Sequence, residues 1–349
     1  MTPLNSVLLT TTLLLSSALA LPNPSPGCAN PKPPNTFDPS GPTTPLTISV
    51  PSAGGLRTYL LSLPPHTSPS PSPSPLILAF HGKDQTATQF STQTQLTDPA
   101  FRLENSIVAF PQGIHEQWLG DPTSPPRGDR DDIAFARALL AELVEQWCID
   151  LNRVYLVGFS NGGGLTHLLA CDPEISEQVA AAAIVSGAFY KDHSLKGSKP
   201  LFGVCGKRDA ALPMLEMHGS ADPVIHYDGK STPDGETYPV EEWLGEWRKR
   251  NGCEGAQSEL KGDIRDGSVQ KTEWWCGKGK EGAKDVVVHY YIRGFGHGWP
   301  STRSQEDDGQ RYGPVAWNAT SDIVRFLAAK SLGGEDEGGE GEAGARDEL

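Results

Sequence analysis

Val154-Tyr-Leu-Val-Gly158-Phe-Ser160-Asn-Gly162-Gly-Gly-Leu-Thr-His-Leu-Leu-Ala170 is the stretch of this 349-residue sequence that decides its fold. An apolar run typical of a buried strand leads into the pattern Gly-x-Ser-x-Gly, and a helical run follows. The turn between them is so tight that side chains at positions 158 and 162 would collide, which explains why both are glycine. The pattern predicts a nucleophile elbow that projects Ser160 Oγ from the carboxyl edge of a sheet. The alternative is a structural glycine-rich turn.

Further short apolar runs on both sides of the elbow predict a parallel sheet. They are residues 76–80, 106–110, 154–157, 181–185, 213–217 and 286–292. The segment from Asp131 to Trp147 has the apolar spacing of an amphipathic helix, and Asp131 and Asp132 suit its N-terminus. Alternating strands and helices indicate an α/β fold, a mostly parallel central sheet with helices on both faces. With a nucleophile elbow this is the α/β-hydrolase fold.

A serine nucleophile needs a general base, and in this fold the base is a histidine near the end of the chain, in a loop after a strand. Of the nine histidines, only His289 and His297 lie beyond residue 226. His289 falls inside the expected strand 286–292, whereas His297 falls just after it between two glycines. We therefore predict His297 as the base, the alternative being a solvated loop histidine.

The carboxylate that orients this base should also follow a strand, between the serine and the histidine in the chain. Asp222 comes directly after the strand 213–217. Asp228 lies farther from the strand end, and Asp209 precedes the strand. We predict Asp222 as the carboxylate, the alternative being an aspartate that caps the turn before Pro223.

Acyl transfer also requires backbone N–H groups that point at the developing oxyanion. One should belong to Asn161, the residue after the nucleophile. The other should come from the loop that begins His81-Gly82-Lys83, after the strand 76–80. We predict the main chain of Lys83 as this donor, with Gly82 as the alternative.

Both ends of the chain and one internal loop differ in composition from the rest. Residues 1–20 carry no charge and end in Ala-Leu-Ala, which indicates a signal peptide rather than a buried N-terminal strand or helix. Residues 21–45 form a Pro-rich leader, and residues 333–349 form an acidic Gly/Glu-rich tail. We expect one catalytic domain over residues 46–332, with the Pro-Ser loop 66–75 inserted between strands of one sheet rather than linking two domains.

The charge balance argues against two classes of partner. The sequence has 43 acidic and 29 basic residues and a formal net charge of -14, which disfavours nucleic acid and anionic membranes. No apolar run approaches the roughly 20 residues of a membrane-spanning helix. No cysteine or histidine pair has C-x-x-C or H-x-x-x-H spacing, so we expect no metal site and no cofactor.

Several blocks of sequence beyond the elbow are characteristic of one family. They are His81-Gly82, Phe110-Pro-Gln-Gly-Ile114, Trp118-Leu-Gly-Asp-Pro122, Ser160-Asn-Gly-Gly-Gly164, Leu169-Ala-Cys-Asp172, Ser186-Gly-Ala-Phe-Tyr190, His289-Tyr-Tyr-Ile292 and Gly296-His-Gly-Trp-Pro300. In this order the chain resembles the secreted fungal feruloyl esterases of carbohydrate esterase family 1, which are related to extracellular polyhydroxybutyrate depolymerases.

The resemblance implies an α/β-hydrolase that cleaves hydroxycinnamate esters, such as ferulate, from the arabinoxylan of plant cell walls. It also implies that Ser160, Asp222 and His297 form the triad. We expect a monomer that acts on feruloylated polysaccharide or oligosaccharide. The alternatives are a polyhydroxybutyrate depolymerase or acetyl xylan esterase and, from another class, an inactive carbohydrate-binding homologue.

Three aromatic residues are candidates for substrate contact. Trp118 and Trp299 each lie in a loop with Gly and Pro neighbours, where an indole can stack on a sugar or phenolic ring. Core packing is the equal alternative for both. Tyr190 follows a run of small residues and is a candidate for the wall of the acyl pocket.

The six cysteines of a secreted chain suggest three disulfides, for which 15 pairings exist. Cys148 and Cys171 should both lie at the amino edge of the sheet, so we pair them. Cys253 and Cys276 enclose a polar segment and would close it as a loop. Elimination then leaves Cys28 with Cys205.

Two modification signals remain. Asn318 begins the only N-x-S/T sequon, but it also precedes an expected helix over residues 319–330, where it could serve as the N-cap. The terminal Arg346-Asp347-Glu348-Leu349 resembles a retrieval signal of the endoplasmic reticulum. We expect an extracellular protein, the alternative being the lumen of the endoplasmic reticulum.

Overall fold

The computed structural model describes residues 22–29, 45–64, 72–124, 130–191, 201–206, 208, 210–232, 235–253, 259–276, 283–302 and 317–332. The predicted signal peptide and acidic tail lie outside these ranges. So do the C-terminal Arg346–Leu349, most of the Pro-rich leader, and residues 66–71 of the Pro-Ser loop.

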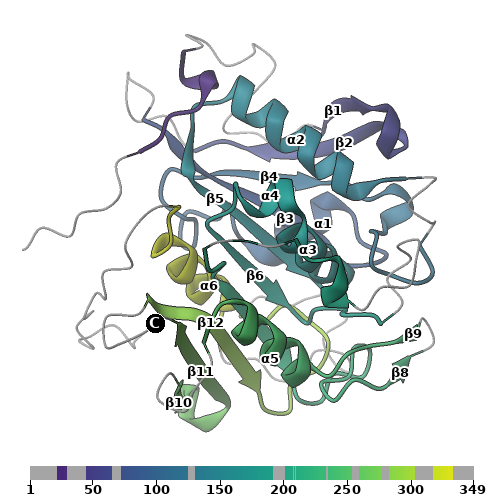
Figure 1. Cartoon of the computed structure of the whole chain (residues 1–349), viewed down its shortest axis with the longest axis vertical. Helices are drawn as coiled ribbons and strands as arrows, with labels where there is room; N and C mark the ends of the chain where they lie inside the picture. The colour runs from purple at the N-terminus through teal and green to yellow at the C-terminus, as the bar shows by residue number, and fades with distance from the viewer. Residues whose placement is uncertain are drawn as a thin grey trace, which may run out of the picture.

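A single sheet of ten strands forms the centre of the molecule (Figure 1). Its strands are β1 (Pro45–Val50), β2 (Gly55–Ser62), β3 (Ser74–Phe80), β4 (Ile107–Pro111), β5 (Ile149–Phe159), β6 (Ala181–Val185), β7 (Met214–Gly219), β10 (Glu259–Ile264), β11 (Val269–Cys276) and β12 (Ala283–Ile292). They lie in the order β1-β2-β4-β3-β5-β6-β7-β12-β11-β10. Neighbours from β4 to β12 are parallel, and antiparallel strands extend both edges. A small separate sheet pairs β8 (Ser231–Thr232) with β9 (Gly235–Glu236).

The helices follow the strands that they cover. They are α1 (Ala87–Thr94), α2 (Asp132–Gln146), α3 (Asn161–Cys171), α4 (Pro173–Ser176), α5 (Val240–Arg250) and α6 (Ala319–Ala328). Helix α2 begins where the sequence predicts, because the Asp131 side chain caps it by accepting from the backbone N–H of Ala134. Short 3-10 turns include η1 (Pro26–Ala29) and η4 (Leu201–Val204).

Helices pack on both faces of the sheet, and alternate residues of one strand serve two separate cores. Leu76, Leu78 and Phe80 of β3 belong to the core that contains α2, α3 and α5, which face the viewer in Figure 1. Ile77 and Ala79 belong to the other core, with α1 and α6. Buried on both faces, the central strands read as continuous apolar runs, which is why the sequence predicts them.

The architecture confirms the predicted α/β-hydrolase fold. The strands on either side of the Pro-Ser loop, β2 and β3, lie in the same sheet, with β4 between them. The polar segment between Cys253 and Cys276 is more than a loop, because β10 and β11 pair there as an antiparallel hairpin. Among the described residues, no helix is long and apolar enough to cross a bilayer.

Two of the three predicted disulfide pairings are wrong. The structure joins Cys28 to Cys148 and Cys171 to Cys205, whereas the pairing of Cys253 with Cys276 is as predicted. The predictions Cys148–Cys171 and Cys28–Cys205 fail because Cys148 and Cys171 are not bonded to each other. Cys148 is bonded to the segment that contains η1, and Cys171 is bonded to the residue that follows η4. Turn η1 packs on α2, and turn η4 packs on α3.

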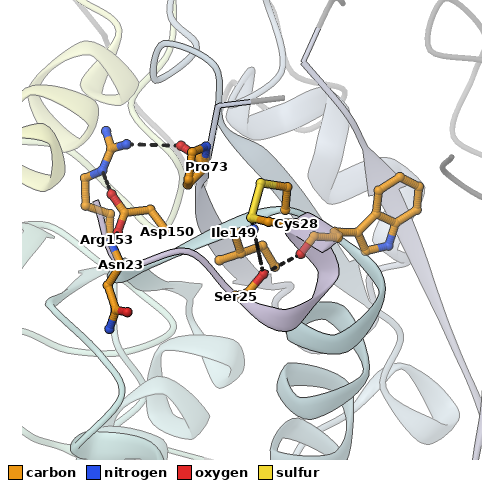
Figure 2. The surroundings of a disulfide bond; sticks show 9 residues. Asn23, Ser25, Cys28, Pro73, Ile149, Asp150 and Arg153 are labelled. Atoms are coloured by element: carbon orange, nitrogen blue, oxygen red, sulfur yellow. Dashed lines mark hydrogen bonds and ion pairs between the residues drawn. A yellow bond between two sulfur atoms is a disulfide. The ribbon is translucent and has the colours of Figure 1, made fainter. Parts of the chain in front are cut away.

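The segment before Cys28 runs antiparallel to the start of β5, which brings this cysteine beside Cys148 (Figure 2). The Ser25 backbone N–H donates to the Ile149 carbonyl, and the Ser25 hydroxyl donates to the Trp147 carbonyl at 2.6 Å. The Asn23 backbone N–H donates to the side chain of Asp150. The leader is therefore paired to the sheet at this point, a contact that its proline content did not predict.

Candidate active site

The predicted nucleophile lies in a strained turn between β5 and α3. Ser160 has φ 52° and ψ -119°, a backbone conformation that a non-glycine residue adopts only under tight constraint. A Cβ atom on Gly162 would lie 2.2 Å from the Phe80 carbonyl oxygen, and one on Gly158 would lie 2.3 Å from the Gly162 carbonyl oxygen. Neither position can hold a side chain without movement of the backbone, which is the geometry that the Gly-x-Ser-x-Gly pattern predicts.

Ser160, His297 and Asp222 come from three segments that follow β5, β12 and β7, and the structure brings them together. His297 Nε2 lies 2.9 Å from Ser160 Oγ, and His297 Nδ1 lies 2.8 Å from Asp222 Oδ2. All three side chains are at most 7% exposed. This arrangement lets the imidazole take a proton from the serine while the carboxylate holds its other nitrogen.

Asp222 is fixed and ionised by its surroundings. Its Oδ1 accepts hydrogen bonds from the backbone N–H groups of Val224 and Ile225, both at 2.8 Å. Burial alone would raise the pKa of Asp222. The electrostatic attraction of the His297 ring and the hydrogen bonds from His218 and His297 outweigh burial and hold this pKa well below its usual range.

The competing candidates lie elsewhere. The Asp228 carboxylate is exposed and pairs with Lys230 at 3.2 Å, and Asp209 lies outside the described residues. His289 is buried within β12, where its Nδ1 lies 2.8 Å from Glu216 Oε2. His289 therefore contacts Glu216, whereas His297 contacts Asp222.

The predicted oxyanion donors lie on the elbow and on the loop packed against it. Asn161 is the first residue of α3, and its neighbour Gly162 fits against the carbonyl groups of Phe80 and His81. The Gly82 N–H donates to Gln85 Oε1 at 3.0 Å, so it is already engaged within its own loop. This favours Lys83 over Gly82. The Lys83 side chain contacts Thr123 and Asp121, as expected if only the main-chain N–H of Lys83 binds the oxyanion.

Trp118 fixes this loop relative to the elbow. Its indole N–H donates to the His81 carbonyl at 2.9 Å, and its backbone N–H donates to Asn161 Oδ1 at 2.8 Å. The Trp118 side chain is 0% exposed. The prediction that it stacks on substrate is therefore not supported, and its packing positions the two segments that carry the oxyanion donors.

Trp299 is also fully buried, in the core that contains α1 and α6. Its indole N–H donates to Thr320 Oγ1, and its ring packs edge-on against Phe90. Core packing is thus what the structure shows for Trp299, in place of the predicted substrate contact. Tyr190 is 3% exposed and packs with Ile225, next to the loop that carries Asp222.

Asn318 serves as the N-cap of α6, the alternative to the predicted glycosylation. Its Oδ1 accepts from the Thr320 backbone N–H at 2.9 Å, and its amide nitrogen donates to Gln95 Oε1. The side chain is buried, so the nitrogen that would carry a glycan is used inside the protein. The glycosylation prediction is corrected on this ground.

Sequence reasoning missed two ionisable residues next to Asp222. Glu216 and His218 lie on β7 and are both 0% exposed. His218 Nδ1 lies 2.9 Å from Glu216 Oε1, and His218 Nε2 lies 3.3 Å from Asp222 Oδ2. The available signal was the sequence Met-Leu-Glu-Met-His, in which two ionisable residues interrupt a strand that is otherwise buried.

One group of potential metal ligands occurs among the described residues. His167, Cys171 and Cys205 offer donor atoms within 4.8 Å of one another. The two cysteines are bonded to each other, however, and the His167 ring accepts from the indoles of Trp243 and Trp247. These contacts do not fit a metal centre, because a ligating sulfur must be a free thiolate.

Several known esterases are similar to this chain in sequence or in fold. Feruloyl esterase D of Neurospora crassa is 27% identical over 326 residues, which cover 89% of this chain and 94% of that protein. Feruloyl esterase B of Piromyces equi is 29% identical over 52% of this chain, a match that covers only 33% of that protein. The solved structure of acetyl xylan esterase from Aspergillus awamori superposes with a TM-score of 0.52 at 16% identity, over 74% of this chain and 96% of that one.

Fold, site and relatives together define a carboxylic ester hydrolase of the α/β-hydrolase fold. Residues 57–214, from β2 to the start of β7, match the family described as esterase PHB depolymerase.

Proposed function

We propose that the protein is a secreted serine esterase that hydrolyses feruloyl and related hydroxycinnamoyl esters on plant cell-wall arabinoxylan. The observation that carries the proposal is the hydrogen-bonded series Ser160–His297–Asp222, with distances of 2.9 and 2.8 Å. Its members stand in the chain order and at the strand ends that an α/β-hydrolase requires. The choice of a feruloyl ester is supported by the two fungal relatives named feruloyl esterases.

The geometry performs acyl transfer in two stages. Ser160 Oγ attacks the ester carbonyl while its proton passes to His297 Nε2, and Asp222 stabilises the imidazolium that forms. The backbone N–H groups of Asn161 and Lys83 bind the oxyanion of the tetrahedral intermediate. His297 then protonates the departing sugar alcohol, which leaves a feruloyl ester on Ser160. Water, deprotonated by His297, hydrolyses this acyl-enzyme and frees the serine.

Secretion is supported by the three disulfides and by the sequence of residues 1–20. Disulfides form and persist in oxidising compartments and are rare in the cytosol. Residues 1–20 have the composition of a signal peptide. An enzyme with this substrate must reach plant cell-wall polymer, so we assign it to the extracellular space.

A panel of esters tests the substrate class. The enzyme should release acid from methyl ferulate, caffeate, p-coumarate or sinapate and from feruloylated arabinoxylan oligosaccharide. A short polyhydroxybutyrate and acetylated xylan are the comparison substrates. Faster turnover of either comparison substrate would assign the enzyme to the depolymerases or acetyl xylan esterases. The control is Ser160→Ala, which should lose on the order of 10⁴-fold in kcat on every ester. Full activity of this variant would refute the serine esterase mechanism.

A further inference from the structure

The buried pair Glu216 and His218 lies next to Asp222, which His218 contacts directly. Both side chains come from alternate positions of β7, so they point to the same face of the sheet. This is the face that α5 covers, since Met214, two residues before Glu216, packs in the same core as α5. Neither residue has a part in acyl transfer as described above.

His218 faces hydrogen-bond acceptors at both ring nitrogens. Its Nδ1 lies 2.9 Å from Glu216 Oε1. Its Nε2 lies 2.8 Å from the Ile225 carbonyl oxygen and 3.3 Å from Asp222 Oδ2. A backbone carbonyl only accepts, and so does an ionised carboxylate. A neutral imidazole carries one N–H, so it would leave one nitrogen lone pair facing an oxygen lone pair. With both carboxylates ionised, both nitrogens of His218 must donate.

The charges in the buried layer favour the same assignment. Asp222 and Glu216 are two carboxylates without solvent exposure, and a buried carboxylate takes up a proton unless a cation or several donors hold it ionised. Among the residues that the structure describes, His218 is the side chain that contacts both of them. An imidazolium at this position stabilises both charges at once.

The remaining groups that face this pair are consistent with a charged His218. From β12, His289 Nδ1 lies 2.8 Å from Glu216 Oε2. His289 Nε2 shares a hydrogen bond of 2.9 Å with the Tyr227 hydroxyl, which also donates to Glu241 of α5. The Tyr291 ring contacts Tyr227 edge-on.

The pKa values of the buried pair shift in the directions that this charge arrangement requires. Burial opposes protonation of His218, but its hydrogen bonds to Asp222 and Glu216 raise its pKa to about 10. For Glu216, burial is outweighed by the hydrogen bonds from His218 and His289, which lower its pKa.

We propose that His218 is a permanently protonated positioning residue, which holds Asp222 ionised and correctly oriented so that Asp222 can fix His297. The proposal rests on the proposed roles of Ser160, His297 and Asp222. In this arrangement the catalytic side chains contact a buried series of ionisable groups, Asp222–His218–Glu216–His289, that reaches from the active site to β12. Asp222 accepts from His297 on one side and from the imidazolium of His218 on the other.

The protonation state can be read directly in the wild-type protein. Long-range ¹H–¹⁵N spectra of protein labelled with ¹⁵N-histidine separate imidazolium rings, in which both nitrogens are protonated, from neutral rings. At pH 8.5 an unperturbed histidine is neutral. We expect the ring of His218 to remain an imidazolium at this pH. A neutral ring would place the proton on Glu216 and overturn the proposal. This measurement needs no substrate, so failure of the proposed function would leave it interpretable.

Kinetics of His218→Gln test the positioning role. Glutamine keeps a hydrogen-bond donor near Asp222 but removes the charge. We expect kcat to fall about tenfold, because a charge-assisted hydrogen bond is roughly twice as strong as a neutral one, with KM nearly unchanged. The matched control is His226→Gln, the same substitution on a half-buried histidine outside the network, which should keep wild-type kinetics. A wild-type kcat in His218→Gln would overturn the positioning role. If that variant does not fold, the spectra of the wild-type protein still decide the charge.

Discussion

The two sides of the active site are positioned by different means. On the nucleophile side, Ser160 is held by backbone packing, because the elbow glycines fit against the carbonyl groups of β3 and α3. On the acid–base side, His297 is held by the Asp222 side chain, and Asp222 is held by two backbone N–H groups and by the buried ionisable residue His218, which contacts Glu216. The geometry of the nucleophile side is therefore independent of pH, whereas that of the acid–base side depends on which groups carry protons.

The largest effect is expected on the acid–base side from Asp222→Asn. The amide preserves the shape but can donate where the carboxylate accepts, so it favours the wrong tautomer of His297. We expect kcat to fall by about 10⁴-fold, as for the equivalent change in a serine protease triad, without loss of fold. Steady-state kinetics on methyl ferulate measure the change. The control is Asp228→Asn, at an exposed aspartate, which should change kcat little. A loss of less than tenfold in Asp222→Asn would contradict its role.

On the nucleophile side, a single methyl group should disturb the elbow. Gly162→Ala would place its Cβ 2.2 Å from the Phe80 carbonyl oxygen, so β3 and α3 must separate. We expect a loss of about 1 to 3 kcal/mol in the free energy of unfolding, with a large loss of activity, measured by urea denaturation and kinetics.

Gly245→Ala provides the matched control for this change. Gly245 lies in α5, where an added Cβ meets nothing within 4 Å, so alanine should be neutral or stabilise by up to about 1 kcal/mol. Equal effects of the two substitutions would show that the close packing of the elbow is not what constrains Gly162.

The acid–base side should show a pH-dependent stability. His218 titrates near pH 6.5 when unfolded and has its pKa raised to about 10 when folded. Its contribution to stability is therefore fully present below about pH 6.5 and is lost as the pH rises towards 10. Between pH 7 and pH 9 the free energy of unfolding should fall by up to about 1.4 kcal/mol per pH unit. Urea denaturation at pH 7, 8 and 9 measures this slope, which should be shallower in His218→Gln. Equal slopes in the two proteins would count against a charged His218.

The smallest effect is expected at Lys83, where only the main-chain N–H binds the oxyanion. Lys83→Met removes the side-chain contacts with Thr123 and Asp121 but leaves the main-chain N–H in place. We expect kcat to change by a few-fold at most, in contrast to the losses of about 10²- to 10³-fold that follow removal of an oxyanion donor. A loss of that larger size in initial-rate assays would mean that the Lys83 side chain itself takes part.

The sequence predicts the elbow and the triad candidates because they depend on local patterns. Gly158 and Gly162 mark a turn that only glycine permits, and Asp222 and His297 each follow an apolar strand. The pairing of Cys28 depends instead on where a Pro-rich leader crosses the sheet, and no local pattern specifies that path. The burial of Trp118 likewise depends on the packing of two loops against each other.

The buried charges of β7 show a second limit. Glu216 and His218 look like polar interruptions of a strand, and in a sequence such residues usually indicate a solvent-exposed face. They are buried because each has a partner: His289, from β12, faces Glu216, and Asp222, in the loop after β7, faces His218. Such compensation is visible only once the strands are placed side by side.

The central claim, that Ser160 is the nucleophile of an ester hydrolase, is tested most directly by covalent labelling. A fluorophosphonate probe reacts with a serine only when a neighbouring base activates it. Intact-mass and peptide mass spectrometry should show one equivalent of probe on Ser160, with esterase activity lost in proportion to labelling. Ser160→Ala should take up none. Absence of labelling in the folded wild-type protein, or labelling at another residue, would contradict the account.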